Sequence, residues 1–462
     1  MAMRMHKIFL VILFCAYGTL FAQSGSVRVN FAHLDHLTET IALDGDSVEI
    51  VHIYANYPDY RWIDAKESGP EGIACVDDAA RAAVVYFRHY EFTHDAASLA
   101  HGRALLNFIM KMETDDGEFY NFLHADHSVN RDGKTSFKSF GWWAARGVWS
   151  MSIGYRLLKD SDPRFAARLM NGIARALPHV EALLTKSGEV KTAGRFRIPQ
   201  WLLYDSGADV TSELLLGLTE FYRATHDKGI ATIIRKLSDG LMVMQDGDAS
   251  TFPYGLHRSW ETMWHAWGNS QSFALAYAGT ELRDTAMIAS AEREARSFYA
   301  RLLIGGMFKE WDCAAPEGKV AYEQIAYGIR PMTLALLRLY DATGKKEYAK
   351  MAGLAASWLF GNNVLHQVMY DTATGRCFDG ISDSAHVNRN SGAESTIEAL
   401  YTLVEIERYP LAKKYLQYRK TNAVTRKHAI EGTFRSASGA VVTLTVDTGK
   451  GTLTIREGKS AK

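Results

Sequence analysis

From about residue 77 onward, apolar side chains recur every three or four positions, which is the spacing of amphipathic helices. Twelve stretches carry this pattern, and joints of only a few residues connect them in pairs. A short joint makes two helices fold back on each other as an antiparallel hairpin. Six consecutive hairpins predict an all-α domain, an (α/α)6 toroid with six inner helices ringed by six outer ones. The predicted helices cover residues 77–93, 95–113, 142–161, 163–185, 210–226, 228–245, 259–281, 283–304, 322–342, 346–360, 392–408 and 410–421.

At both ends of this helical region the pattern changes to alternation, which predicts short β segments at the N- and C-termini. Residues 26–30 and 48–54 alternate weakly near the start of the chain. Residues 441–446 and 452–455 alternate on either side of a Gly-containing turn and predict a small hairpin. The predicted divisions are a signal peptide (1–22), an N-terminal extension with short strands (23–76), the toroid (77–425) and a β-hairpin tail (426–462).

The first residues have the three parts of a secretory signal peptide. Arg4 and Lys7 supply positive charge, an apolar run begins at Ile8, and Ala22 is a suitable cleavage point. The run is short for a membrane span, and no other segment is long and apolar enough to be one. We therefore expect a periplasmic or secreted protein without stable membrane insertion.

Charge is balanced, with 52 basic and 52 acidic side chains among 462 residues and a formal net charge of zero. This balance gives no electrostatic reason to bind nucleic acid, whereas a neutral polysaccharide fits at least as well. Cys75, Cys313 and Cys377 would remain after cleavage, and we expect them to be buried as small hydrophobic residues. The sequence has neither a phosphate-binding loop nor a ligand spacing typical of metal sites, so we expect no metal and no cofactor.

Two adjacent carboxylates, Asp77 and Asp78, stand at the start of the first long helix. One acidic residue at this place is ordinary helix capping. Two repel each other, and in a concave site one of them would have a raised pKa. The pair is therefore either a cap with a solvated neighbour or part of a catalytic site. If one caps and the other acts, we expect Asp78 to face the cavity.

Polar and aromatic residues collect at the starts of the odd-numbered helices, whereas the partner helices begin with routine caps such as Asp95 and Asp162. If the odd-numbered helices form the inner ring, their starts meet at one mouth. Aromatic faces stack on sugar rings and polar side chains bind hydroxyls, so this mixture suits a carbohydrate cleft, although core packing is the alternative for any single Trp. The candidate substrate-binding residues are Arg81, Glu118, Asn121, Trp142, Arg146, Tyr204, Asp205, Trp260, Trp264, His265, Glu323, Asp379, Asn388 and Asn390.

Glu394 opens the predicted eleventh helix, directly after an Asn-rich segment. A Glu so near a helix start can complete a capping box with Ser391. The density of Asn388, Asn390 and Glu394 at one helix entrance favours a catalytic or substrate-binding role.

Three blocks of sequence together resemble six-hairpin glycosidase-like proteins of bacteria, a family without an established reaction. The blocks are CVDDAARAA at 75–83, DGEFYNF at 116–122, and GRCFDGI at 375–381 followed by NRNSGAEST at 388–396. The resemblance spans residues 48–408 and implies the toroid and a link to carbohydrate.

More remotely, the layout resembles family nine endoglucanases, in which an Asp pair activates water and a later Glu protonates the leaving group. Asp77, Asp78 and Glu394 occupy comparable places. The resemblance thus implies a glycoside hydrolase with Asp77 or Asp78 as general base and Glu394 as general acid. An apolar wall from Trp260 or Trp264 would help to raise the pKa of Glu394.

Two other functions fit the same predicted mouth. A polysaccharide lyase or sugar epimerase on this toroid would use Tyr204, His265 or Arg146 to abstract a proton from the sugar. A non-catalytic glycan-binding protein would use the same residues without turnover, although neutral sugars need fewer acidic groups than the mouth provides.

Overall fold

The computed structural model describes residues 29–66, 69 and 71–458, so the predicted signal peptide lies outside the described residues. Eleven helices in this part of the chain have ten or more residues, and a π-helical turn (Ala295–Tyr299) joins α9 to the short α10. The helices are α1 (Ala32–Leu37), α2 (Val76–Thr93), α3 (Ala96–Met112), α4 (Trp142–Leu158), α5 (Pro163–Leu184), α6 (Ala208–Thr225), α7 (Lys228–Val243), α8 (Gln271–Leu282), α9 (Thr285–Glu294), α10 (Ala300–Gly305), α11 (Arg330–Thr343), α12 (Lys346–Ala356), α13 (Ala393–Glu407) and α14 (Pro410–Lys413).

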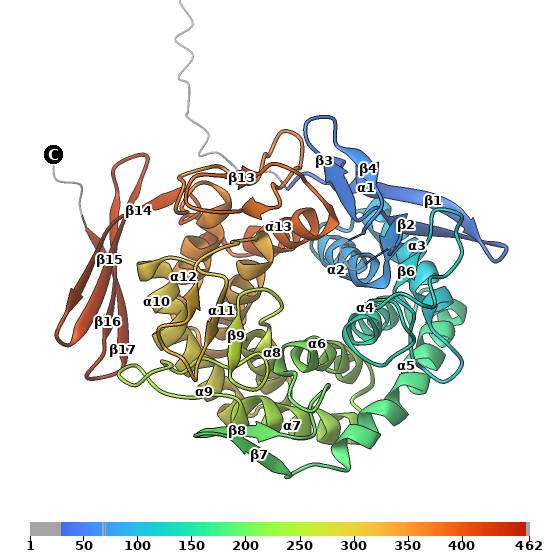
Figure 1. Ribbon diagram of the computed structural model, residues 1–462, viewed down its shortest axis with the longest axis horizontal. Helices are drawn as coiled ribbons and strands as arrows, with labels where there is room; N and C mark the ends of the chain where they lie inside the picture. Colours follow the sequence, from blue (N-terminus) through green and yellow to red (C-terminus); the bar gives the residue numbers. More distant parts are fainter. Residues whose placement is uncertain (1–28, 67–68, 70, 459–462) are drawn as a thin grey trace, which may run out of the picture.

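Helices α2, α4, α6, α8, α11 and α13 follow one another around a closed inner ring. Each packs against the next, and α13 packs against α2 (Figure 1). Each inner helix also packs against the helix that follows it in sequence, and these partners are α3, α5, α7, α9, α12 and α14. The consecutive helical hairpins predicted from the short joints are therefore present.

The helix starts differ between the two sets. Asp95, Asp162, Asp227 and Asp284 cap outer helices, each accepting a backbone N–H of the first turn, as predicted for routine caps. Inner helices α4, α6, α8, α11 and α13 have no side-chain cap, and α2 uses the sulfur of Cys75. The polar side chains at the inner starts are thus available for contacts other than capping.

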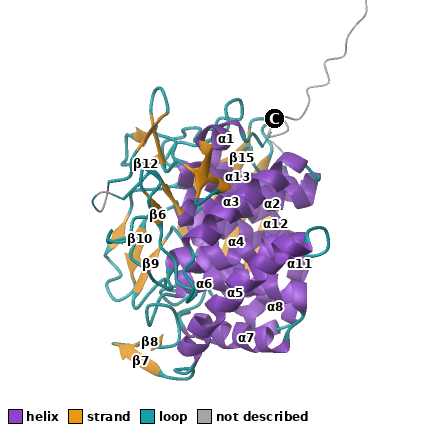
Figure 2. Cartoon of the chain, turned by 90° about the vertical axis from the view of Figure 1, so that its right-hand side faces the viewer, coloured by secondary structure: helices purple, strands orange, loops and turns teal. Residues whose placement is uncertain are grey.

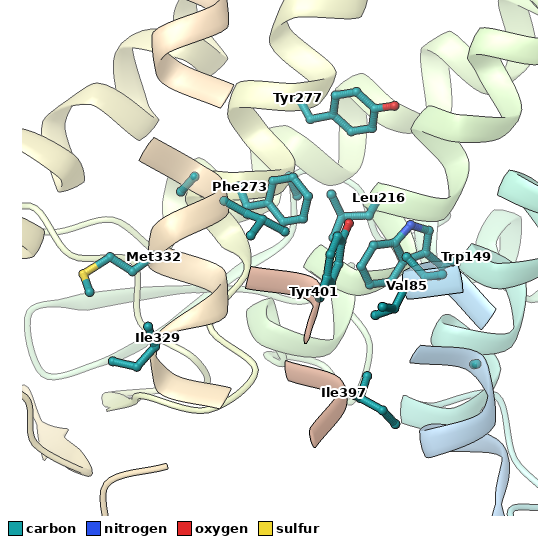
Figure 3. Close-up of a cluster of buried hydrophobic side chains, with 14 of the residues drawn as sticks. Val85, Trp149, Leu216, Phe273, Tyr277, Ile329, Met332, Ile397 and Tyr401 are labelled. Carbon is teal, nitrogen blue, oxygen red and sulfur yellow. The ribbon is translucent and has the colours of Figure 1, made fainter. Parts of the chain in front are cut away.

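Large buried side chains fill the axis of the ring. Trp149 of α4, Phe273 of α8 and Tyr401 of α13 converge there (Figure 3). The Trp149 ring lies 6.5 Å from Phe273 and 6.1 Å from Tyr401, within the range of favourable aromatic pairs. The middle of the ring is therefore packed core.

Ion pairs join the C-terminal ends of the inner helices beyond this core. Glu405 of α13 contacts Arg88 of α2 at 2.6 Å and Arg338 of α11 at 3.0 Å. Arg156 of α4 contacts Glu220 of α6 at 2.5 Å. Cations near helix C-termini are favourable because the helix dipole is negative there. These pairs connect neighbouring helices at the end opposite the predicted mouth.

Short strands and long loops gather at one end of the helical body (Figure 2). Near the N-terminus, β1 (Thr38–Leu43) and β2 (Asp46–Val51) confirm the predicted short β segments. Several further strands, which were not predicted, lie in loops between helices. The other paired strands are β3 (Tyr54–Asn56) with β4 (Arg61–Ile63), β5 (Ala74–Cys75) with β6 (Phe122–Leu123), β7 (Val190–Ala193) with β8 (Phe196–Pro199), β9 (Met263–His265) with β10 (Glu310–Asp312), β10 with β11 (Lys319–Val320), and β12 (Gly380–Ile381) with β13 (Val387–Asn388).

The C-terminal region is a four-stranded antiparallel sheet rather than the predicted two-stranded hairpin. It contains β14 (Tyr418–Arg426), β15 (Ala429–Ser436), β16 (Val441–Asp447) and β17 (Thr452–Gly458) in sequence order. The sheet packs against α10 and α12 (Figure 1). The predicted helix 410–421 therefore ends at Lys413, because pairing with β15 takes over from Tyr418.

Two other predicted helices begin too early. Residues 259–270 contain β9, which pairs with β10, and Gly268 has a φ of 70° that a helix does not allow. The predicted helix 322–342 begins at Arg330, since Pro331 fits a first helical turn and disfavours helix before it.

The sequence predicted no membrane span after the signal peptide. Among the described helices, none is both long and apolar enough to cross a membrane. Cys75, Cys313 and Cys377 are buried and unpaired within the described residues, which confirms the expected burial.

Candidate active site

A cavity of about 560 Å³ opens at the end of the ring where the inner helices begin. The starts of α2 and α13 form much of its wall, and β3 with β4 forms another part. It brings together nine predicted site residues: Asp77, Asp78, Arg81, Arg146, Glu323, Asp379, Asn388, Asn390 and Glu394. Tyr54, Asn56, Ile63 and Cys75 also line it and were not predicted.

Arg81 joins the two helices that carry the predicted catalytic carboxylates. Its Nη2 lies 2.6 Å from Asp78 Oδ1. Its Nη1 lies 3.2 Å from Glu394 Oε2 and 3.0 Å from Glu398 Oε1. Because Arg81, Asp78 and Glu398 are all at most 4% exposed, the bonds among these three form largely out of water and are correspondingly strong.

The two adjacent aspartates have different environments, and neither caps α2. The Asp77 side chain is 20% exposed and lies 2.8 Å from Arg146 Nη1. The Asp78 side chain is 4% exposed, and it binds Arg81 and the Cys75 thiol. Burial raises the pKa of Asp78 above its ordinary value, and Arg81 offsets only part of this effect. Both aspartates line the cavity, and Asp78 was expected to face it. Asp77 is the more accessible of the two, whereas Arg81 holds the Asp78 carboxylate in the cavity wall.

Glu394 lies in the cavity with a side chain that is 45% exposed. It binds Arg81, and the N-cap of α13 is Gly392, so Glu394 does not form the capping box that was the alternative. Desolvation in the concave site raises the pKa of Glu394, and nearby Asp78 and Glu398 add to this against Arg81. Neither Trp260 nor Trp264 lines the cavity, so the apolar wall predicted to raise this pKa is absent.

A chain of buried charges that the sequence analysis missed lies under the cavity. Glu398, which is 1% exposed, bridges Arg81 and Arg330, with 2.6 Å between its Oε2 and Arg330 Nε. Arg330 Nη2 in turn lies 3.2 Å from Glu213 Oε1, and the Arg330 guanidinium lies over the Tyr327 ring, 5.1 Å from its centroid. One sequence signal could have indicated this cluster, namely a charged residue inside a strongly apolar helix. Glu398 is such a residue, and it lies one helical turn after Glu394.

Trp142 and Tyr204 lie beside the cavity. The Arg146 guanidinium stacks over the Trp142 ring at 4.8 Å, and the backbone N–H of Trp142 donates to the Tyr204 hydroxyl at 3.3 Å. Tyr204 is 53% exposed. These rings therefore extend the polar wall at Arg146 with an aromatic surface.

His265 is fully buried between the rings of Trp260 and Trp267, at centroid distances of 4.7 and 3.8 Å. Its Nε2 lies 2.7 Å from Asp209 Oδ2. Its Nδ1 has no hydrogen-bond partner among the described residues. Asp209, which was not predicted, thus orients a histidine with one ring nitrogen left unused.

The remaining predicted residues take other positions. Asn121 supports the site from behind, because its Nδ2 lies 3.4 Å from Asp77 Oδ2. Glu118 pairs with Lys138 and Asp205 with Lys186, both away from the cavity, and Trp264 is packed in the core against Phe298 and Phe308. Among the described residues, no group of three or more His, Cys, Asp or Glu side chains could hold a metal ion.

No family model matches the sequence, and no curated protein is significantly similar to it. Cellobiose 2-epimerase from Bacillus thermoamylovorans B4167 has a similar structure, with a TM-score of 0.58 and 13% identity over 81% of this chain and 95% of that protein. A D-mannose isomerase has a TM-score of 0.54 and 12% identity over 78% of this chain and 91% of its own. The family 9 endoglucanase J30 reaches a TM-score of 0.47 and 16% identity, covering 78% of this chain and 75% of its own. The first two show the six-hairpin toroid fold that was predicted.

Proposed function

We propose that this protein is a secreted or periplasmic glycoside hydrolase that acts by general acid–base catalysis. The observation that carries the proposal is Glu394, a half-exposed carboxyl with a raised pKa in the same cavity as Asp77. A general acid for glycoside cleavage must hold its proton near the working pH, which a raised pKa favours.

In this mechanism Glu394 donates its proton to the glycosidic oxygen as the bond to the sugar carbon breaks. Asp77, oriented by Arg146 and Asn121, accepts a proton from the water that attacks this carbon. Asn388 and Asn390 bind substrate hydroxyls through their amides. Asp78 does not act directly and instead fixes Arg81.

The charges of the cavity favour an uncharged sugar. Five acidic side chains line it, against Arg81 and Arg146 alone, and both guanidinium groups already bind carboxylates. Glu323 is exposed in the cavity and has no ion pair among the described residues. The resulting negative potential opposes binding of a uronate, which argues against a lyase acting on an acidic polysaccharide.

Epimerisation or isomerisation of a sugar is a second candidate, and the Asp209–His265 pair favours it. In that reaction His265 would remove the proton beside the carbonyl carbon of an open-chain sugar, which requires the buried histidine ring to open to the substrate. The cellobiose 2-epimerase and the D-mannose isomerase of similar structure are consistent with such chemistry on this fold.

One experiment separates these functions. The full-length mature protein is incubated in deuterated water with a panel of neutral oligosaccharides and reducing sugars, and products are followed by NMR. New reducing ends that disappear in Glu394→Gln support hydrolysis. Deuterium at the carbon beside the carbonyl, lost in His265→Asn, supports epimerisation. Saturable binding with neither change indicates a glycan-binding protein, and absence of all three signals refutes a role for the cavity in carbohydrate chemistry.

A further inference from the structure

A second cavity, of about 490 Å³, lies where the C-terminal sheet meets the outer helices. Its apolar wall is made by Leu302 and Leu303 of α10 and Leu354 of α12. Lys420 of β14 reaches it from the sheet. The volume falls within the roughly 300–1,000 Å³ of small-molecule sites. It is separate from the cavity at the starts of the inner helices, which we call the mouth cavity. Acidic side chains predominate in the mouth cavity, whereas this second cavity has a lysine and no acidic side chain among its lining residues.

The ammonium group of Lys420 has no acidic partner in this cavity. Its Nζ donates to the carbonyl of Ile304 at 3.0 Å, near the C-terminal end of α10. The carbonyl at the helix end accepts one hydrogen bond from the ammonium group, which has three N–H donors in all. None of the described residues that line the cavity is Asp or Glu. Burial lowers the pKa of Lys420, and no nearby charge counters this effect.

Trp358 adds a further unused donor to the cavity floor. It is 2% exposed, and its indole Nε1 has no hydrogen-bond partner among the described residues. An ammonium group with donors to spare and an indole N–H without an acceptor, next to apolar side chains, suit a ligand with one anionic end and an apolar body.

We propose that this cavity binds a small organic monocarboxylate, with its carboxylate at Lys420 and its apolar part against Leu302, Leu303 and Leu354. A single cation matches a single negative charge, whereas a phosphate dianion would need more than one. The inference does not depend on the proposed hydrolase activity, because it uses none of the residues of the mouth cavity.

Calorimetry on the full-length mature protein tests the proposal with hexanoate, hexanamide and inorganic phosphate as probes. Hexanoate is expected to bind at least tenfold more tightly than the other two. Lys420→Met is expected to weaken hexanoate binding at least tenfold, whereas Lys420→Arg retains it. Lys414→Met removes an exposed lysine outside the cavity and serves as the matched control.

A second measurement covers the case in which Lys420→Met does not fold. In the wild type, NMR titration of the Lys420 side chain should show its pKa rising when hexanoate is added, because the carboxylate stabilises the charged amine. Equal binding of hexanoate and hexanamide, no binding of hexanoate, or an unchanged Lys420 pKa on saturation would each overturn the proposal.

Discussion

Arg81 Nη1 lies 3.2 Å from Glu394 Oε2, although 313 positions separate the two residues in sequence. The same guanidinium binds Asp78 at 2.6 Å, so one side chain links the carboxylates at the starts of α2 and α13. The carboxylates around Arg81 therefore fall into two groups: those that hold the cavity wall in place and those that are open to the cavity. Asp78 and Glu398 are buried partners of Arg81, whereas Asp77 and Glu394 remain accessible.

This separation predicts different effects of neutral substitutions at the two neighbouring aspartates. Asp77→Asn and Glu394→Gln should lower kcat roughly 10²–10⁴-fold, because each removes a proton-transfer group, while the melting temperature changes little. Asp78→Asn should instead destabilise the protein by about 1–3 kcal/mol, because buried Arg81 loses a charged hydrogen-bond partner but keeps Glu398. Turnover and urea unfolding, measured together, distinguish the two classes.

Asp205→Asn is the matched control for these variants. Asp205 is an exposed aspartate that pairs with Lys186 outside the cavity, so its substitution should leave both activity and stability close to the wild type. If Asp78→Asn lost activity without losing stability, and Asp77→Asn kept full activity, the roles assigned to the pair would be exchanged.

The pH dependence of activity should report the proton on Glu394. The acid form is the active one, so the alkaline limb of kcat should lie above the ordinary Glu pKa of 4.5. Asp78→Asn removes a negative charge beside Glu394 and frees Arg81 to interact with it more strongly. Both changes lower the pKa of Glu394, and the alkaline limb should therefore move to lower pH.

The pH–rate profile should be measured below the unfolding temperature of Asp78→Asn and compared with a carbon NMR titration of Glu394. The Glu394→Gln protein identifies the resonance by its absence. An alkaline limb that stayed in place while the NMR pKa moved would mean that another group carries the catalytic proton.

Much of this architecture was predictable because it depends on local signals. Helical periodicity and short joints gave the hairpins, and Asp95 or Asp162 before a helix gave the outer caps. The mouth cavity followed from polar residues at the starts of alternate helices, and Asp77, Arg146 and Glu394 do line it.

The parts that were missed depend on contacts between segments far apart in sequence. Residues 259–270 have an apolar spacing compatible with a helix, but Trp264 packs between Phe298 and Phe308 while its backbone pairs with β10. Glu398 and Arg330 sit inside apolar helices, and only the closed ring brings them together. Such tertiary contacts override local propensity, and a charge inside an apolar helix does not by itself show which partner it will meet.

The charge of the mouth cavity predicts discrimination between substrates. A neutral oligosaccharide should bind the full-length protein at least tenfold more tightly than a uronate oligomer of equal length at low salt. Glu323→Gln should narrow this ratio severalfold, because it removes an exposed negative charge from the cavity. Glu118→Gln, outside the cavity and paired with Lys138, is the control. Calorimetry at two ionic strengths checks the result, and tighter binding of the uronate would contradict it.

The ion pairs at the opposite end of the ring predict a large and pH-dependent effect on stability. Glu405 is fully buried between Arg88 and Arg338. Desolvation alone would raise its pKa, but these two arginines lower the pKa of Glu405 to about 2. Glu405→Gln removes the one carboxylate that Arg88 and Arg338 share and leaves each with a single, more exposed acidic partner, Glu91 and Asp341. It should reduce the free energy of unfolding by roughly 3 kcal/mol at neutral pH.

The sign of the pH dependence follows from the lowered pKa. Glu405 stabilises the folded protein fully above the ordinary pKa of 4.5, and this contribution disappears as pH falls toward about 2. The difference in urea stability between wild type and Glu405→Gln should therefore be constant above about pH 5.5 and shrink progressively below it. Glu181→Gln, an exposed change on α5 with no ion pair among the described residues, should stay within about 0.5 kcal/mol at every pH. A difference that persisted unchanged into acid would mean that the Glu405 carboxylate does not act through its charge, and that the ring is held at this end by packing alone.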